Sequence, residues 1–216
     1  MTDKEIQQAA LSELEWEPEV SSTEIGVAVK DGVVTLSGFV DSYVKKYNAE
    51  RAVKRVYGVK AVANDLEVKL PSENERTDPE IARAAVRALE SRYILPHDKI
   101  KVTVRNGWVT LEGNVEWQFQ KESAESAVRQ LMGVKGVTNL ITVKPPVSAA
   151  DVKVKIEEAL RRSAELDARS IMVETSDSKV VLRGTVHSWA EREEAERAAW
   201  SAPGVAKVED LISVVP

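Results

Sequence analysis

Residues 25–40 read IGVAVKDGVVTLSGFV, with apolar residues alternating with other residues on either side of Asp31-Gly32. Alternation with a period of two predicts β-strands that bury one face. An Asp-Gly pair suits the positive φ angles of a two-residue hairpin turn. The segment therefore predicts two antiparallel strands joined by a tight turn, with Val34, Leu36 and Val40 facing the core.

The same pattern recurs twice further along the chain. The motif Val-x-Leu-x-Gly-x-Val spans residues 34–40, 109–115 and 180–186. Asn106-Gly107 repeats the turn signal, and Asp177-Ser178 weakens it. We therefore expect three copies of one unit, called repeats 1, 2 and 3 below. Their predicted boundaries are residues 2–70, 77–145 and 148–216.

Each repeat also carries the signals of two helices and a third strand. Thr2 with Glu5 and Thr77 with Glu80 match a capping box at a helix start, and Ser148 with Asp151 matches it more weakly. The order α-β-β-α-β predicts an α+β fold in which each repeat is a three-stranded mixed sheet covered on one face by two helices. The apolar face of the first helix, spaced four apart, comprises Ile6, Ala10, Leu14, then Ile81, Ala85, Leu89, then Val152, Ile156, Leu160.

Composition narrows the classes of function. The 216 residues are 43% hydrophobic and 30% charged, which is typical of a folded soluble protein. The chain has no cysteine, which excludes disulfides, thiolate zinc sites and cysteine nucleophiles. Its net charge of −5 disfavours non-specific adsorption to nucleic acid or to anionic lipid, so any such binding must be local. No apolar run could span a bilayer and the first residues lack the pattern of a signal peptide, so we expect a cytoplasmic protein.

No catalytic, metal or cofactor site is predicted. The two histidines, His97 and His187, lie in different repeats, and neither has a serine or paired carboxylates at a spacing typical of a triad or a metal site. The sequence also lacks the phosphate-binding motif GxxxxGK[ST]. These observations favour a protein that is not an enzyme and has no cofactor.

The segments DGVVTLSG at 31–38 and GVKAVANDL at 58–66 resemble the BON domain of bacterial osmotically induced and nodulation proteins. The resemblance extends to all three repeats and is looser in repeat 3, which has Ser178 in place of the turn glycine and Asp210 where the others have Asn64 and Asn139. It implies a non-enzymatic protein of bacterial stress or envelope physiology. Such a protein would bind a phospholipid membrane surface or, alternatively, mediate protein assembly without lipid affinity.

Repeat 2 has the charge best suited to an anionic partner. It holds ten basic and eight acidic residues, for +2, whereas repeats 1 and 3 are each −3. Because Ile100, Val102 and Val104 face the helices, Lys99, Lys101 and Arg105 should point to the other face of the sheet, where Trp108 joins them. Three cations beside an indole favour a phospholipid surface. A solvated face, or one covered by another repeat, is the alternative.

Two further sets of residues recur among the repeats. The aromatic residues Tyr43, Trp117 and Trp189 lie near the start of the second helix, where they would serve a membrane or partner surface or, alternatively, fasten the helix start. Asn64, Asn139 and Asp210 should tie the third strand to a nearby backbone group. The glycines Gly38, Gly113 and Gly184 should mark the close approach of a helix or a bulge.

Two hypotheses follow for the partner. In the first, the chain attaches to phospholipid through the outward residues of repeat 2. In the second, the uncovered sheet faces and the recurring aromatic residues bind other copies of the chain, giving a homo-oligomer, or bind a client protein.

Overall fold

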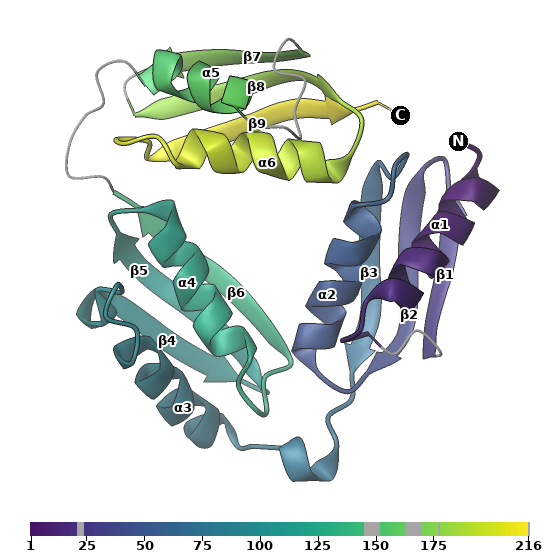
Figure 1. The fold of residues 1–216 in the computed structure, drawn as a ribbon. Helices are drawn as coiled ribbons and strands as arrows, with labels where there is room; N and C mark the ends of the chain where they lie inside the picture. Colours follow the sequence, from purple (N-terminus) through teal and green to yellow (C-terminus); the bar gives the residue numbers. More distant parts are fainter. Residues whose placement is uncertain (21–23, 145–151, 163–169, 177, 216) are drawn as a thin grey trace. The chain divides into compact units, whose positions relative to one another are not determined.

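The computed structural model describes residues 1–20, 24–144, 152–162, 170–176 and 178–215. Each repeat forms its own three-stranded sheet and two helices, as the sequence predicts, and the fold class is confirmed (Figure 1). Within each sheet the strands lie in sequence order, so that the second strand is central.

The elements follow one plan three times. Repeat 1 contains α1 (Asp3–Trp16), β1 (Ile25–Lys30), β2 (Val33–Val40), α2 (Tyr43–Lys54) and β3 (Ala61–Val68). Repeat 2 contains α3 (Asp78–Glu90), η3 (His97–Lys99), β4 (Ile100–Arg105), β5 (Trp108–Val115), α4 (Gln118–Arg129) and β6 (Gly136–Val143), and a short 3-10 helix, η2 (Ser72–Asn74), lies between repeats 1 and 2. Repeat 3 contains α5 (Val152–Arg162), β7 (Ile171–Ser176), β8 (Lys179–Val186), α6 (Trp189–Trp200) and β9 (Lys207–Val214).

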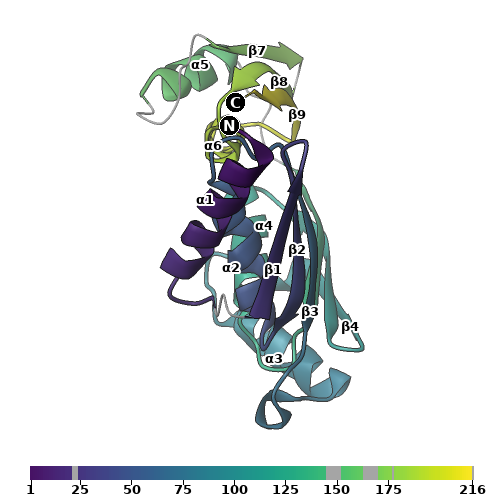
Figure 2. The ribbon, with the colours of Figure 1, turned by 90° about the vertical axis from the view of Figure 1, so that its right-hand side faces the viewer.

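The central strand of a sheet runs antiparallel to one neighbour and parallel to the other. β5 is antiparallel to β4 and parallel to β6, and β8 has the same relation to β7 and β9. A parallel pair needs a crossover, and α4 and α6 supply it. In Figure 2, α1 and α2 lie on the same side of the sheet of repeat 1. The opposite face of each sheet is free of that repeat's own helices.

The core of each repeat lies between its helices and its sheet. All nine apolar positions predicted for the first helices are buried. The central strands contribute Val34 and Leu36, Val109 and Leu111, and Val180 and Leu182, each at most 1% exposed. The second helices use small residues, such as Ala49, Ala124 and Ala195, which let helix and sheet approach closely.

Capping boxes begin the helices α1 and α3, as predicted. Glu5 and Glu80 each accept a hydrogen bond from the N-cap amide, of Thr2 at 2.7 Å and Thr77 at 2.8 Å. Hydrogen bonds from the Thr2 amide and hydroxyl hold the pKa of Glu5 below its ordinary value, and the Thr77 hydroxyl and amide do the same to the pKa of Glu80. The weaker capping pair, Ser148 with Asp151, lies outside the described residues.

A carboxylate from the first helix holds the hairpin turn of repeats 1 and 2. Asp31 and Asn106 have φ of 54° and 53°, each followed by a glycine of positive φ, as the predicted turn requires. The two amides of each turn donate to one carboxylate, that of Asp3 at 2.8 and 3.0 Å and that of Asp78 at 2.8 Å each. We call this arrangement the carboxylate clasp. Repeat 3 lacks its residues, because the sequence has Ala149 and Ser178 at the equivalent positions.

The glycines of the central strands have a different role from the one expected. A Cβ at Gly113 would lie 2.0 Å from the carbonyl oxygen of Lys99, and Gly38 and Gly184 meet equivalent carbonyls at 2.0 and 1.9 Å. Their φ angles are between 113° and 142°. The expectation that a helix approaches here is therefore wrong. A Cβ at each glycine would instead overlap the backbone of the residue that directly precedes the neighbouring strand.

Candidate functional site

The recurring polar residue of the third strand is a structural tie. Asn64 and Asn139 accept a hydrogen bond from the amide two residues ahead, at 3.3 and 3.2 Å. Their side-chain amides donate to the second helix, Asn64 to the Glu50 carboxylate at 3.0 Å and Asn139 to the Lys121 carbonyl at 2.9 Å. The predicted role in tying the strand to nearby backbone is confirmed.

Repeat 3 achieves the same tie with opposite charges. Asp210 accepts from the Ile212 amide at 2.9 Å and from the Arg192 guanidinium at 2.5 Å. Arg192 and Asp210 stand where repeat 2 has Lys121 and Asn139. Repeat 3 therefore has an ion pair where repeat 2 has a hydrogen bond from an asparagine side chain. The polar residues at this position are thus engaged within their own repeats.

The three aromatic residues near the second helix do not occupy equivalent positions. Tyr43 and Trp189 are the first residues of α2 and α6, whereas Trp117 is the N-cap of α4. Repeats 1 and 3 have serine at that N-cap, and the hydroxyls of Ser42 and Ser188 accept an amide three residues ahead. All three aromatic side chains are half-buried.

For Trp117 and Trp189, contacts within the first turn of the helix support the interpretation that they fasten the helix start. Trp117 stacks on Phe119, with ring centroids 6.4 Å apart, and the Arg192 guanidinium lies 4.8 Å from the Trp189 ring. The aromatic residues therefore do not assemble into one recurring surface.

The outward strand residues Lys101, Arg105 and Trp108 of repeat 2 lie on the sheet face opposite its helices, and Lys99 is the last residue of η3, directly before β4. We call Lys99, Lys101, Arg105 and Trp108 the basic face. Arg105 pairs directly with Trp108 across the hairpin, and Lys101 pairs with Glu112. All four side chains are exposed, Trp108 by 47%. Glu112 shares this face and is not among the residues predicted for it, although alternation from Trp108 through Thr110 reaches it.

The cations of the basic face differ in their partners from those of repeat 3. No ion pair within the described residues involves Lys99, Lys101 or Arg105. On the matching face of repeat 3, Lys179 pairs with Glu209, and Arg183 lies 3.7 Å from Glu174. The Lys179 ammonium holds the pKa of Glu209 below its ordinary value through a hydrogen bond and its charge. Among the described residues, the three cations of the basic face are therefore without an acidic partner, whereas Lys179 and Arg183 of repeat 3 each have one.

The Trp108 indole is held flat against the sheet. Trp108 pairs with Gly136 of β6, and a Cβ at Gly136 would lie 2.4 Å from the indole six-membered ring. The indole Nε1 donates to the Thr138 hydroxyl at 2.8 Å. One ring face is thus covered by glycine and the ring orientation is set by a hydrogen bond.

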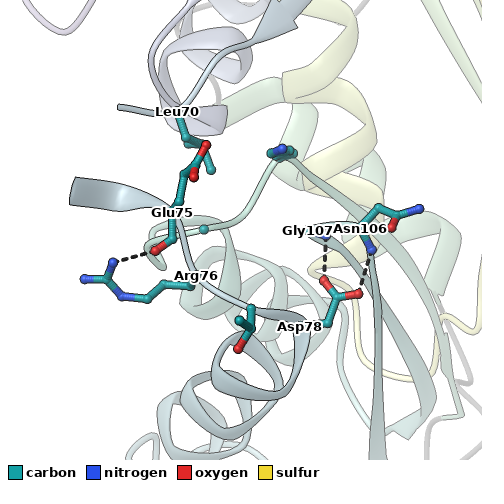
Figure 3. Close-up of a pocket in the computed structure, with 9 residues that line it drawn as sticks. Leu70, Glu75, Arg76, Asp78, Asn106 and Gly107 are labelled. Atoms are coloured by element: carbon teal, nitrogen blue, oxygen red, sulfur yellow. Dashed lines mark hydrogen bonds between the residues drawn. The ribbon is translucent and has the colours of Figure 1, made fainter. Parts of the chain in front are cut away.

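Two hollows flank the hairpin turn of repeat 2. One, of about 500 Å³, lies on the basic face and is lined by Thr103, Arg105, Asn106, Trp108 and Thr110. The other, of about 320 Å³, includes Arg76, Asp78 and Lys135 (Figure 3).

The polar groups of the second hollow are largely committed to the fold. Asp78 forms the carboxylate clasp with the turn amides, and the Arg76 guanidinium donates to the carbonyls of Glu73 and Glu75 at 2.8 and 2.7 Å (Figure 3). This hollow is consequently a poor candidate for a ligand.

The described residues contain no cluster of three or more histidine, cysteine or acidic side chains suited to a metal ion. Among the helices that the structure describes, none has both the length and the apolar character needed to cross a membrane.

The fold and its free sheet faces define a class, proteins built of tandem α-β-β-α-β repeats. Within that class the chain belongs to the BON domain family, whose model matches residues 2–69, 77–145 and 148–216. This confirms the resemblance drawn from the sequence.

One curated relative is the osmotically-inducible protein Y of Escherichia coli (strain K12), which is 33% identical over 129 residues. The match covers 58% of this chain and 64% of the length of that protein. Family and relative together link the fold to an osmotically inducible protein.

Solved structures of CdsD, a structural protein of the type III secretion system of Chlamydia trachomatis, also match. The match to one of these structures covers 98% of this chain and 93% of the CdsD chain, with a TM-score of 0.28 and 13% identity. The match to a structure of the C-terminal domain of CdsD covers 100% of both chains, with a TM-score of 0.27 and 12% identity. Likeness at this level carries no functional argument.

Proposed function

We propose that the chain is a non-catalytic binding protein that attaches to anionic phospholipid surfaces through the basic face of repeat 2, and acts in the response of a bacterium to osmotic stress. The observation that supports it best is a set of three exposed cations that form no ion pair with any residue the structure describes, next to an exposed indole. Similarity to an osmotically-inducible protein supports the physiological setting.

Simple electrostatics makes the proposed attachment weak and sensitive to salt. A basic side chain near an anionic leaflet contributes about 1 kcal/mol, so three contribute roughly 3 kcal/mol. Glu112 opposes part of this attraction. A Debye length of about 8 Å at physiological ionic strength means that added salt should release the protein.

The test is co-sedimentation with vesicles of phosphatidylglycerol and phosphatidylcholine. Replacing two cations of the basic face, Lys101→Gln/Arg105→Gln, should weaken binding about 30-fold, the equivalent of about 2 kcal/mol. The matched control is Arg83→Gln/Arg87→Gln, which removes the same charge from exposed positions on α3, on the other side of the sheet.

The comparison between the two double variants separates a local surface from overall charge. We expect the control to bind within about three-fold of the wild type, since its lost charges lie away from the proposed surface. Equal weakening by both variants would contradict a role for the basic face. If the wild-type chain fails to sediment with vesicles even at low salt, the phospholipid proposal is wrong, and assembly through the free sheet faces becomes the function to test.

A further inference from the structure

The hollow on the basic face has features that diffuse attraction to a charged surface does not require. Trp108 is paired with a glycine, and its ring lies on that glycine with Nε1 bonded to Thr138. At the equivalent pair, repeat 1 has Val33 and Ala61 and repeat 3 has Lys179 and Lys207. The combination of indole, glycine and hydroxyl therefore belongs to repeat 2 alone.

The groups beside the ring are unengaged hydrogen-bond donors. Arg105 lies directly across from Trp108, and Thr103 lies across from Thr110. Among the described residues, neither the Arg105 guanidinium nor the hydroxyl of Thr103 or Thr110 has a hydrogen-bond partner. These side chains line the same hollow of about 500 Å³.

These hydrogen-bond donors suit a phosphate group. A guanidinium binds two oxygens of a phosphate through parallel hydrogen bonds, and hydroxyls can donate to the remaining ones. The exposed face of the indole ring can pack against C–H groups, such as those of the glycerol part of a lipid headgroup. Because the ring is already held in place, little side-chain entropy is lost on binding.

We infer that the hollow lined by Thr103, Arg105, Trp108 and Thr110 seats one phosphodiester headgroup of a glycerophospholipid. The inference rests on the proposed attachment to phospholipid and specifies where on the basic face a single lipid is recognised. Lys99 and Lys101 then supply general attraction, whereas Arg105 and Trp108 recognise the headgroup.

The test uses a soluble headgroup, glycerophosphoglycerol, so that no membrane surface is involved. The chain has five tryptophans, and Trp108→Phe identifies the Trp108 signal among the indole N–H signals in a proton–nitrogen NMR spectrum. We expect the Trp108 signal to shift saturably, with a dissociation constant of about 1 to 10 mM for one charge-assisted contact pair. The other four indole signals should stay in place.

Matched variants separate recognition from charge. Arg105→Gln should weaken headgroup binding at least about ten-fold, since it removes the paired contact, whereas Lys101→Gln loses the same charge and should bind within about two-fold. Gly136→Ala changes no charge, but its methyl group would displace the indole and should also abolish the saturable shift. The amide spectrum outside this face reports whether each variant is folded.

Several results would overturn the inference. These are no saturable shift of Trp108, equal weakening by Arg105→Gln and Lys101→Gln, or a shift that inorganic phosphate produces and the headgroup does not. If vesicle binding still depends on Lys101 and Arg105 while the headgroup titration fails, the inference falls and the proposed attachment stands. If vesicle binding fails as well, both fall.

Discussion

At the residue scale, Gly113 shows how a backbone contact can dictate the identity of a residue. It faces the Lys99 carbonyl, and its φ of 142° lies in a region that other residues rarely adopt. The position therefore combines two constraints, a forbidden Cβ and an unusual backbone angle, and glycine satisfies both. The same holds in the other two repeats, which explains why this glycine recurs.

We predict that Gly113→Ala destabilises repeat 2 by roughly 2 to 6 kcal/mol, because backbone strain of about 1 to 3 kcal/mol adds to a steric overlap of similar size. Native-state hydrogen exchange of the β5 amides measures it. Gly26→Ala is the control, since its Cβ would approach the Ser37 hydroxyl, which can rotate away. Unchanged exchange in Gly113→Ala would show that the strands can separate without loss of stability.

At the scale of elements, the third strand is tied to the second helix by two interchangeable chemistries. Repeats 1 and 2 use an asparagine amide, and repeat 3 uses Asp210 with Arg192. The pair is partly exposed, with side-chain exposures of 25% for Arg192 and 13% for Asp210. Its contribution should therefore be smaller than that of a fully buried ion pair.

We predict that Asp210 and Arg192 are energetically coupled by about 0.5 to 1.5 kcal/mol. Asp210→Asn alone leaves Arg192 without its carboxylate partner, whereas Asp210→Asn/Arg192→Lys recreates the pair of residue types found in repeats 1 and 2. A double-mutant cycle, with hydrogen exchange of the β9 amides as the readout, should show that the double variant loses less than the sum of the single variants. Strictly additive losses would contradict the coupling.

The elements themselves could be predicted because their signals are local. The hairpins follow from Asp31-Gly32 and Asn106-Gly107, and the helix starts from threonine and glutamate three residues apart. Buried positions follow from periodicity. The outward direction of Lys101 and Arg105 could be predicted in the same way, since alternation along a strand needs no knowledge of the rest of the fold.

Features that depend on pairing between distant strands could not be predicted. The contact of Trp108 with Gly136 needs the register of β5 against β6, and α4 separates these strands in sequence. The carbonyl facing Gly113 likewise belongs to a neighbouring segment. By contrast, the offset of Trp117 by one position from Tyr43 and Trp189 can be read from the sequence, since Ser42 and Ser188 stand at the position that Trp117 occupies.

At the scale of the whole molecule, three copies of one fold carry different surface chemistry. Repeat 2 keeps exposed cations without internal ion pairs, and repeat 3 pairs its own. Repeat 3 also lacks the residues of the carboxylate clasp, with Ala149 and Ser178 in place of an aspartate and the turn glycine. Surface function and local stability are therefore distributed unevenly along the chain.

We predict that repeat 3 opens more readily than repeats 1 and 2. Glycine favours a turn with positive φ, and a carboxylate stabilises its amides, and the sequence of repeat 3 has Ser178 and Ala149 at the positions that supply these two groups in repeats 1 and 2. Amide hydrogens of β8 should exchange about ten-fold faster than those of β2 and β5, which corresponds to a difference of about 1.4 kcal/mol. Ala149→Asp/Ser178→Gly should slow exchange in β8 and leave β2 unchanged. Exchange in β8 as slow as in β5 would contradict the prediction.

The carboxylate clasp of repeat 2 also bears on chemical ageing. In an Asn-Gly pair the glycine nitrogen can attack the asparagine side chain, releasing ammonia and leaving a succinimide that water opens to aspartate or isoaspartate. Here the Gly107 N–H donates a hydrogen bond to the Asp78 carboxylate at 2.8 Å, and this hydrogen bond must break before the nitrogen can react. Aspartate would fit, as Asp31 does in repeat 1. Isoaspartate would lengthen the backbone by one carbon beside Arg105 and Trp108, so we expect the hydrogen bond to Asp78 to slow chemical damage next to the basic face.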